Sequence, residues 1–94
     1  MNACLLRVNF YLGGCRSLKE KRQRLRGIRE RYGKSPSVSV CESDHQDVHT
    51  QAQWSFIASA ADAGVVESTL MELERSIQLS VDAEVTAVDR EWLV

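Results

Sequence analysis

The sequence lacks the features that membrane, secreted and fibrous proteins need. Its apolar runs are a few residues long, far short of the roughly 18–20 residues that cross a bilayer, and no basic stretch followed by an apolar segment opens the chain. One proline and five glycines exclude collagen-like and low-complexity chains. The 94 residues suffice for one modest core. We therefore expect a single cytoplasmic domain over residues 1–94 that has no contact with a membrane.

The sequence has few cysteines, and their spacing does not suggest pairs. Cys4, Cys15 and Cys41 are an odd number at wide spacings, and no Cys-x-x-Cys pair is present. This pattern fits neither a disulfide framework nor a zinc site. Cys4 and Cys41 lie in strand-like runs, where a free cysteine acts as a small apolar residue. We interpret all three as reduced thiols.

Charge is nearly balanced in total but strongly segregated along the chain. The net charge is −1. Residues 16–34 hold nine basic and two acidic residues, whereas residues 35–94 hold eleven acidic and two basic residues. Such segregation creates a local positive field that the total conceals. Nucleic acid and acidic protein surfaces are both candidate partners for the basic segment.

The first third of the chain predicts a strand followed by a helix. Leu5–Leu12 alternates apolar and polar residues with period two, as a strand with one buried face does. Ser17 and Glu20 have the spacing of a capping box, so a helix should follow over Leu18–Tyr32. Gly33 then suits the left-handed position that commonly ends a helix.

The rest of the chain predicts strand, strand, helix, strand. The two central strands are a short one around Val38 and Val40 and a longer one from about Val48 to Ala60, with Ile57 as an apolar exception on its polar side. Asp62 is the predicted N-cap of a helix that ends near Ser80. The final strand covers residues 84–92. Its alternation puts Val85 and Ala87 on one side and Thr86 and Val88 on the other, but which side faces the core stays open.

The predicted order of elements is βαββαβ. This order is typical of the α+β ferredoxin-like sandwich, in which two helices cover one face of a four-stranded antiparallel sheet. The polar residues of the first three strands would then line the open face of the sheet. Because this fold hosts many unrelated activities, function has to be argued from sites.

Three segments of the sequence resemble the YlxP-like family of small bacterial proteins of unknown function. They are Ser-Leu-Lys-Glu-Lys-Arg at residues 17–22, Asp-His-Gln-Asp at 44–47 and Arg-Glu-Trp-Leu at 90–93. The sequence departs from the family at Asp44-His45, where two acids are more common, and at Arg24, which is commonly aliphatic. The resemblance implies a ferredoxin-like fold and a gene neighbourhood of translation and ribosome-maturation factors, without an assigned reaction.

The basic helix is the strongest functional signal. Arginines and lysines on its exposed flanks would contact phosphates of structured RNA with little dependence on base sequence. A solvated face is the alternative, since exposed charges are common on helices. Gly27 should point away from the sheet, whereas Lys21 falls in the apolar stripe and should either reach past the sheet edge or pair with a carboxylate. The predicted RNA-binding residues are Arg16, Lys19, Arg22, Arg24, Arg26 and Arg29.

The loop around residues 44–49 gives a weaker signal. His45 and His49 lie near acidic residues, but on a hairpin their spacing does not bring both rings to one side, so we expect no metal there. Asp44 and Asp47 are better explained as turn residues that bind the local backbone. No catalytic triad, phosphate-binding loop or nucleotide fingerprint is present, so we expect no enzyme activity and no cofactor.

The open sheet face supplies the alternative function. RNA-recognition motifs place aromatic residues on their central strands, but these positions are mostly polar here. An apolar patch there would instead support a homodimeric protein-interaction module that binds no nucleic acid. Trp54 is predicted to lie in the core. The candidate dimer surface consists of Tyr11, Ile57, Val88 and Trp92.

Overall fold

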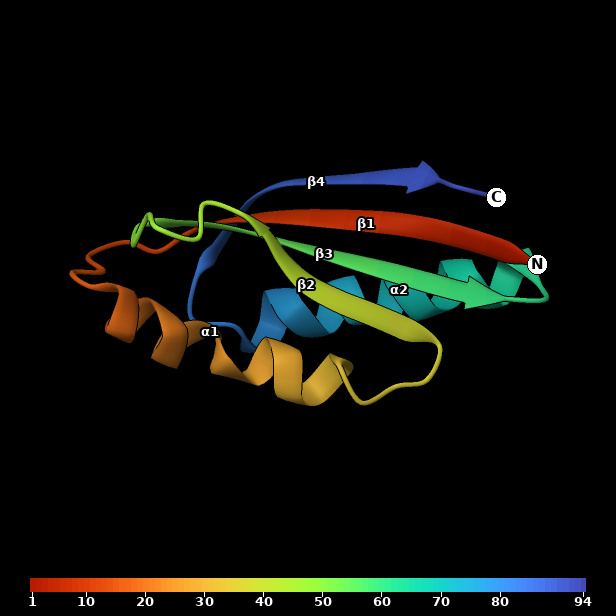
Figure 1. Ribbon diagram of the computed structural model, residues 1–94, viewed down its shortest axis with the longest axis horizontal. Coiled ribbons are helices and arrows are strands. Elements are labelled where there is room, and N and C mark those ends of the chain that lie inside the picture. The colour runs from red at the N-terminus through yellow and green to blue at the C-terminus, as the bar shows by residue number, and fades with distance from the viewer.

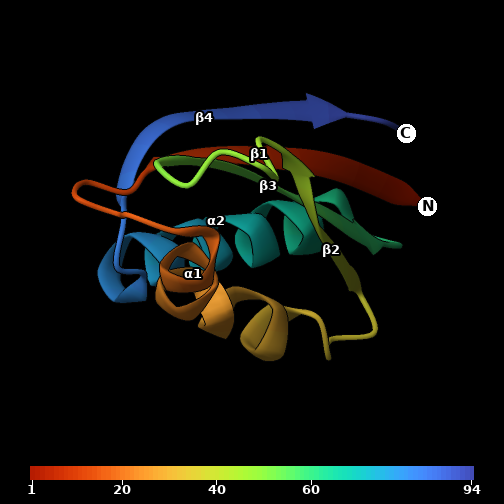
Figure 2. The ribbon, with the colours of Figure 1, turned by 60° about the vertical axis from the view of Figure 1, so that its left-hand side comes forward.

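The computed structural model describes residues 1–94 and has the expected order of elements. These are β1 (Asn2–Tyr11), α1 (Leu18–Tyr32), β2 (Val38–Asp44), β3 (Gln51–Ala60), α2 (Ala63–Ser80) and β4 (Glu84–Trp92). The strands form one antiparallel sheet in the order β2-β3-β1-β4. Both helices lie on the same face of this sheet, and the other face is open (Figures 1 and 2). The predicted ferredoxin-like sandwich is confirmed.

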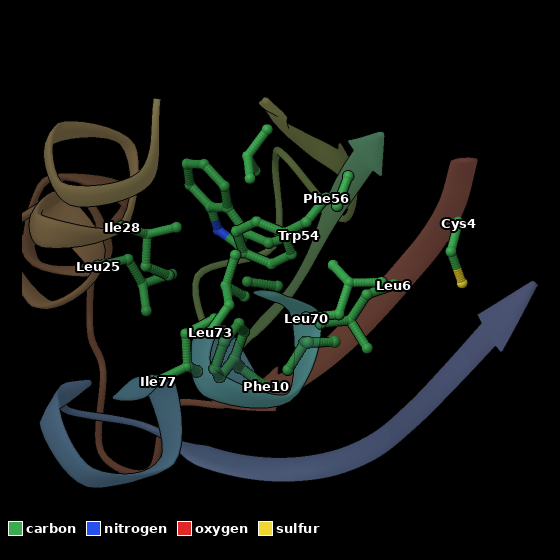
Figure 3. Close-up of a cluster of buried hydrophobic side chains, with 14 of the residues drawn as sticks. Cys4, Leu6, Phe10, Leu25, Ile28, Trp54, Phe56, Leu70, Leu73 and Ile77 are labelled. Carbon is green, nitrogen blue, oxygen red and sulfur yellow. The ribbon is translucent and has the colours of Figure 1, made fainter. Parts of the chain in front are cut away.

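The core lies between the sheet and the helices. Leu6, Val8 and Phe10 of β1 alternate with polar residues and are fully buried, as the period-two pattern predicts. Helix α1 contributes Leu25 and Ile28, which meet the side chains of β3 and α2 in one cluster (Figure 3). Each element therefore buries one face only, and the opposite face of α1 is left to solvent.

The helix starts agree with the capping signals. The Ser17 hydroxyl accepts a hydrogen bond from the Glu20 amide at 3.0 Å, and the Glu20 carboxylate accepts one from the Arg16 amide at 3.5 Å. Asp62 caps α2 by accepting from the Gly64 amide at 2.7 Å. These contacts satisfy backbone donors that a helix start leaves unpaired. Both helices therefore begin where the sequence predicts.

The end of α1 differs from the prediction. Gly33 has φ −72° and is right-handed, so the left-handed cap expected there is wrong. A glycine is suited to this position for a steric reason, because a Cβ atom would lie 2.6 Å from the carbonyl oxygen of Arg29. Gly27 is exposed, and a Cβ atom there would meet no atom within 4 Å. Gly27 thus points away from the sheet as predicted.

The two glycines should respond oppositely to alanine. We expect Gly27→Ala to raise the free energy of unfolding by about 1 kcal/mol, because alanine costs less backbone entropy inside a helix. Gly33→Ala should lower it by about 1 kcal/mol, because the added methyl group displaces the helix end. Urea denaturation of the two variants beside the wild type measures both effects. Equal shifts of the same sign would contradict the steric explanation.

A β-bulge fixes the register of β4. Val85 lies opposite Phe10 and Ala87 opposite Asn9, which leaves Thr86 as an extra residue whose hydroxyl donates to the Asn9 carbonyl. Because a bulge breaks the period of two, the side that each later residue faces is reversed. The predicted alternation of this strand is therefore wrong.

The bulge also divides the predicted dimer surface. Val88 pairs with Val8 and Trp92 pairs with Cys4, and directly opposed residues in an antiparallel pair point to the same face. Both partners belong to the buried face of β1, so Val88 and Trp92 lie on the helix side of the sheet. Tyr11 is on the open face. The predicted four-residue surface is therefore not one patch.

No helix in the structure is long and apolar enough to serve as a membrane span.

Candidate functional site

Lys21 is the only charged residue in the core, with 3% of its surface exposed. Its ammonium group donates to the carbonyl oxygens of His45 at 2.7 Å and Val48 at 2.8 Å. It also pairs with the Glu42 carboxylate, where Nζ and Oε2 are 3.1 Å apart. All three hydrogens of the ammonium group are therefore used. Of the two interpretations of Lys21, pairing with a carboxylate is correct.

These contacts hold the connection between β2 and β3 against α1. The connection turns at His45, which has φ +62°, and the Asp44 carboxylate accepts a hydrogen bond from the His45 amide at 2.7 Å. Asp44 therefore acts as a turn residue, as expected. Because Lys21 binds two carbonyls of this segment, residues 45–48 stay beside the helix instead of extending into solvent.

A groove of about 460 Å³ lies between the β2–β3 connection and the side of α1. Arg22, Arg26 and Arg29 form one wall, since spacings of four and three residues place side chains on one side of a helix. The other wall carries Gln46 and Asp47. The floor and remaining lining are Leu18, Lys21, Leu25, Glu30, Glu42 and Trp54.

Trp54 belongs both to the core and to the floor of this groove. It is 7% exposed, and its indole reaches toward α1 on the side of the cluster where Leu25 and Ile28 lie (Figure 3). The Arg29 guanidinium lies over the ring, with its carbon 5.6 Å from the ring centroid, which is within cation–π distance. The indole nitrogen has no hydrogen-bond partner in the protein. The predicted core position is confirmed, whereas its place in a groove was not anticipated.

The arginines of the groove are not paired with carboxylates. The ion pairs made by lysine and arginine side chains are those of Arg7, Lys21, Arg24 and Arg90. The groove arginines therefore have no carboxylate within ion-pair distance. The same is true of the exposed Arg16 and Lys19 at the start of the helix. Charges that no carboxylate neutralises are available to an anionic ligand.

Arg24 differs from the other predicted RNA-binding residues because its guanidinium is occupied. It donates to the carbonyls of Gly13 at 2.9 Å and Asp82 at 2.8 Å, and it lies 3.6 Å from the Glu20 carboxylate. These contacts join α1 to the loop after β1 and to the segment before β4, on the side away from the groove. Arg31, on the same side, donates to serines of α2. We therefore assign Arg24 a structural role and leave it out of the candidate surface.

The open sheet face is mainly polar. Arg7 forms an ion pair with Asp89 at 2.8 Å, and the hydrogen bond to this carboxylate raises the pKa of the Arg7 guanidinium above its ordinary value. Tyr11 and Ile57 are 45% and 38% exposed, and they lie on different strands several residues apart in register. No continuous apolar patch follows from these two residues alone.

The thiols and the loop histidines do not form a site. Cys4 and Cys15 are buried, Cys41 is exposed, and all three are free. No group of three or more His, Cys, Asp or Glu side chains is arranged so that it would hold a metal ion. What the structure does bring together is the lining of the groove, in which three arginines supply positive charge and hydrogen-bond donors and Glu30, Glu42 and Asp47 supply carboxylates.

Comparison with protein families gives one match, which covers residues 3–90 and is described as a protein of unknown function, DUF503. The chain belongs to the DUF503 family. The family description carries no activity, substrate or partner, and it contains nothing specific to an enzyme. A search of curated proteins finds no match.

This DUF503 protein resembles a solved structure in fold. A de novo designed protein with a ferredoxin fold, determined by solution NMR, is 10% identical with a TM-score of 0.52, over 100% of this chain and 87% of the designed one. The YXEP protein of Bacillus subtilis, described as a dinuclear metal binding peptidase from the M20 family, is 11% identical with a TM-score of 0.49. That match covers 97% of this chain and 25% of the peptidase. The designed protein shows the fold alone.

Proposed function

We propose that this protein is a non-enzymatic cytoplasmic accessory protein that docks on structured RNA through the groove side of α1. The observation that carries the proposal is the row formed by Arg22, Arg26 and Arg29, none of which is paired with a carboxylate. Arginine binds phosphate through a planar fork of donors and stays charged at any physiological pH. Lys19 and Arg16 extend the basic surface toward the start of the helix.

The spacing of the arginines suits a strand of phosphates. With a rise of about 1.5 Å per residue, Arg22 and Arg29 are separated by about 10 Å along the helix axis. The row therefore extends along more than one nucleotide of a backbone. Because phosphate contacts carry no sequence information, affinity should depend on RNA shape and salt more than on base order.

We place the proposed RNA binding in translation because of the family resemblance. The resemblance to YlxP-like proteins implies a neighbourhood of translation and ribosome-maturation factors, and ribosomal RNA is the structured RNA of that setting. The polar open face of the sheet, where Tyr11 is the only aromatic residue among the central strands, argues against base stacking there. The helix side is therefore the face that we assign to RNA.

The proposal predicts binding that weakens steeply with salt. The purified protein should co-sediment with ribosomal subunits and bind structured ribosomal RNA at about 50 mM salt. The logarithm of the binding constant should fall with the logarithm of salt with a slope of about −4, because each of the five phosphate contacts contributes about −0.7 to −0.9. Fluorescence anisotropy with labelled RNA at four salt concentrations measures this slope.

Two results would overturn the proposal. One is protein that stays in the supernatant even at the lowest salt. The other is a slope near zero, because binding without counterion release cannot depend on arginine–phosphate contacts. A dimer at micromolar concentration without RNA binding would instead favour the alternative of a homodimeric interaction module.

A further inference from the structure

The two walls of the groove differ in chemistry: one carries arginines and the other carries hydrogen-bond acceptors. The inference drawn from this difference rests on the proposed function and specifies which part of the RNA is bound. We infer that the groove receives one unpaired nucleotide of the bound RNA. Its phosphate lies against Arg22 and Arg26, its base stacks on the Arg29 guanidinium, and the base edge faces the wall that carries Gln46 and Asp47. A nucleotide that carries an exocyclic amino group, namely adenosine, cytidine or guanosine, fits this wall better than uridine.

Arg29 supplies the stacking surface. Its guanidinium carbon lies over the Trp54 ring, 5.6 Å from the ring centre. The residue is exposed, so it remains accessible to a ligand. RNA-binding proteins commonly stack unpaired bases on arginine planes. Trp54 is itself nine-tenths buried, so the base would lie on Arg29 and not on the indole.

The opposite wall supplies hydrogen-bond acceptors. The Gln46 amide nitrogen donates to the Glu42 carbonyl at 3.1 Å, which fixes the amide and leaves its oxygen free. Asp47 makes no ion pair in the protein, and neither does Glu30 at the edge of the groove. Carboxylates accept hydrogen bonds and do not donate them. Adenine, cytosine and guanine each present an exocyclic amino group with two N–H donors, whereas uracil has no amino group and offers only its single N3–H.

The size of the groove suits a single nucleotide. Its volume of about 460 Å³ lies in the lower part of the range for small-molecule sites. In paired RNA the base edges are occupied and the bases remain stacked, and recognition is by shape and backbone. A bulged or looped nucleotide is free to enter. The groove would therefore distinguish bulged from fully paired RNA, which phosphate contacts alone cannot do.

A set of hairpins tests this inference. Three RNAs share one stem and differ only in a single bulged adenosine, a single bulged uridine or no bulge. Each is titrated into a Trp92→Phe variant, in which Trp54 is the only remaining tryptophan. The adenosine bulge should bind about tenfold tighter than the paired stem, which is the size that stacking of one base contributes. The uridine bulge should fall between them, and Trp54 emission should change with the bulged RNAs only.

Arg29→Ala in the same background should remove the preference for the bulge and weaken binding to the paired stem only a few-fold. Arg75→Ala, an equal loss of charge at an exposed position of α2, should keep the preference. Equal affinity for all three hairpins with the salt slope retained would overturn the inference and leave the proposed function intact. If the Trp92→Phe protein with all its arginines bound none of the hairpins, both the inference and the proposed function would be overturned. Adenosine monophosphate that binds as tightly as the bulged RNA would make the groove a site for free nucleotides and overturn the assignment to RNA.

Discussion

Replacing Lys19, Arg22 and Arg26 by glutamate should abolish RNA binding at micromolar protein concentration. Each substitution removes a phosphate contact and adds a negative charge, so attraction along this side of α1 turns into repulsion. The fold should be unaffected, because all three side chains are exposed and none makes an ion pair within the protein. Co-sedimentation with ribosomal subunits and anisotropy with labelled RNA measure the loss, and circular dichroism checks the fold.

A matched pair of single variants separates position from charge. Arg22→Glu lies beside the groove, whereas Arg75→Glu lies at an exposed position of α2 and changes the net charge by the same amount. We expect Arg22→Glu to weaken binding at least tenfold and to make the salt slope shallower by about one, since one phosphate contact is lost. Arg75→Glu should change affinity less than threefold. Equal losses in the two variants would mean that net charge, and not the groove side of α1, governs binding.

The fold was predictable because its signals are local. The alternation in Leu5–Leu12, the capping residue Ser17 and the apolar stripe of α1 each report the environment of neighbouring residues, and each predicted its element correctly. The bounds differ by a few residues, as in β1, which starts at Asn2. Periodicity reports which side of an element is buried, and this is enough to define the order of strands and helices.

The errors fall where the structure depends on distant residues. The β4 bulge is a property of how Thr86 fits opposite Asn9 and Phe10, so no pattern within the strand reveals it. The shift reverses Val88 and Trp92 to the helix side and removes them from the expected dimer surface. Gly33 is similar, because its need for a small residue comes from the carbonyl of Arg29 and not from its own φ.

Only one wall of the groove could be predicted from the sequence. The row of arginines follows from helix spacing, and it correctly placed Arg22 and Arg26 together on one flank. The second wall follows from contacts of Lys21 with residues more than 20 positions away. A lysine in an apolar stripe was the available signal, since a buried ammonium group needs several acceptors and must draw another segment toward it.

Lys21→Met should lower the free energy of unfolding by about 3–5 kcal/mol, which is a large part of the 5–15 kcal/mol of a typical domain. Methionine fills much of the same space but donates no hydrogen bond. The carbonyls of His45 and Val48 lose their donor, and the Glu42 carboxylate, with 24% of its side chain exposed, loses its counter-charge. Urea denaturation gives the change as a shift of the midpoint with little change of slope.

Two variants test whether this cost belongs to the contacts of Lys21 or to lysine replacement in general. Lys19→Met makes the same chemical change two residues earlier on the same helix at an exposed position, and it should shift stability by less than about 0.5 kcal/mol. Glu42→Gln keeps a hydrogen-bond acceptor for Lys21 and should cost less than Lys21→Met, because the two carbonyl contacts remain. If Lys21→Met were no more destabilising than Lys19→Met, the buried ammonium group would not be what holds the β2–β3 connection, and with it the second wall of the groove, against α1.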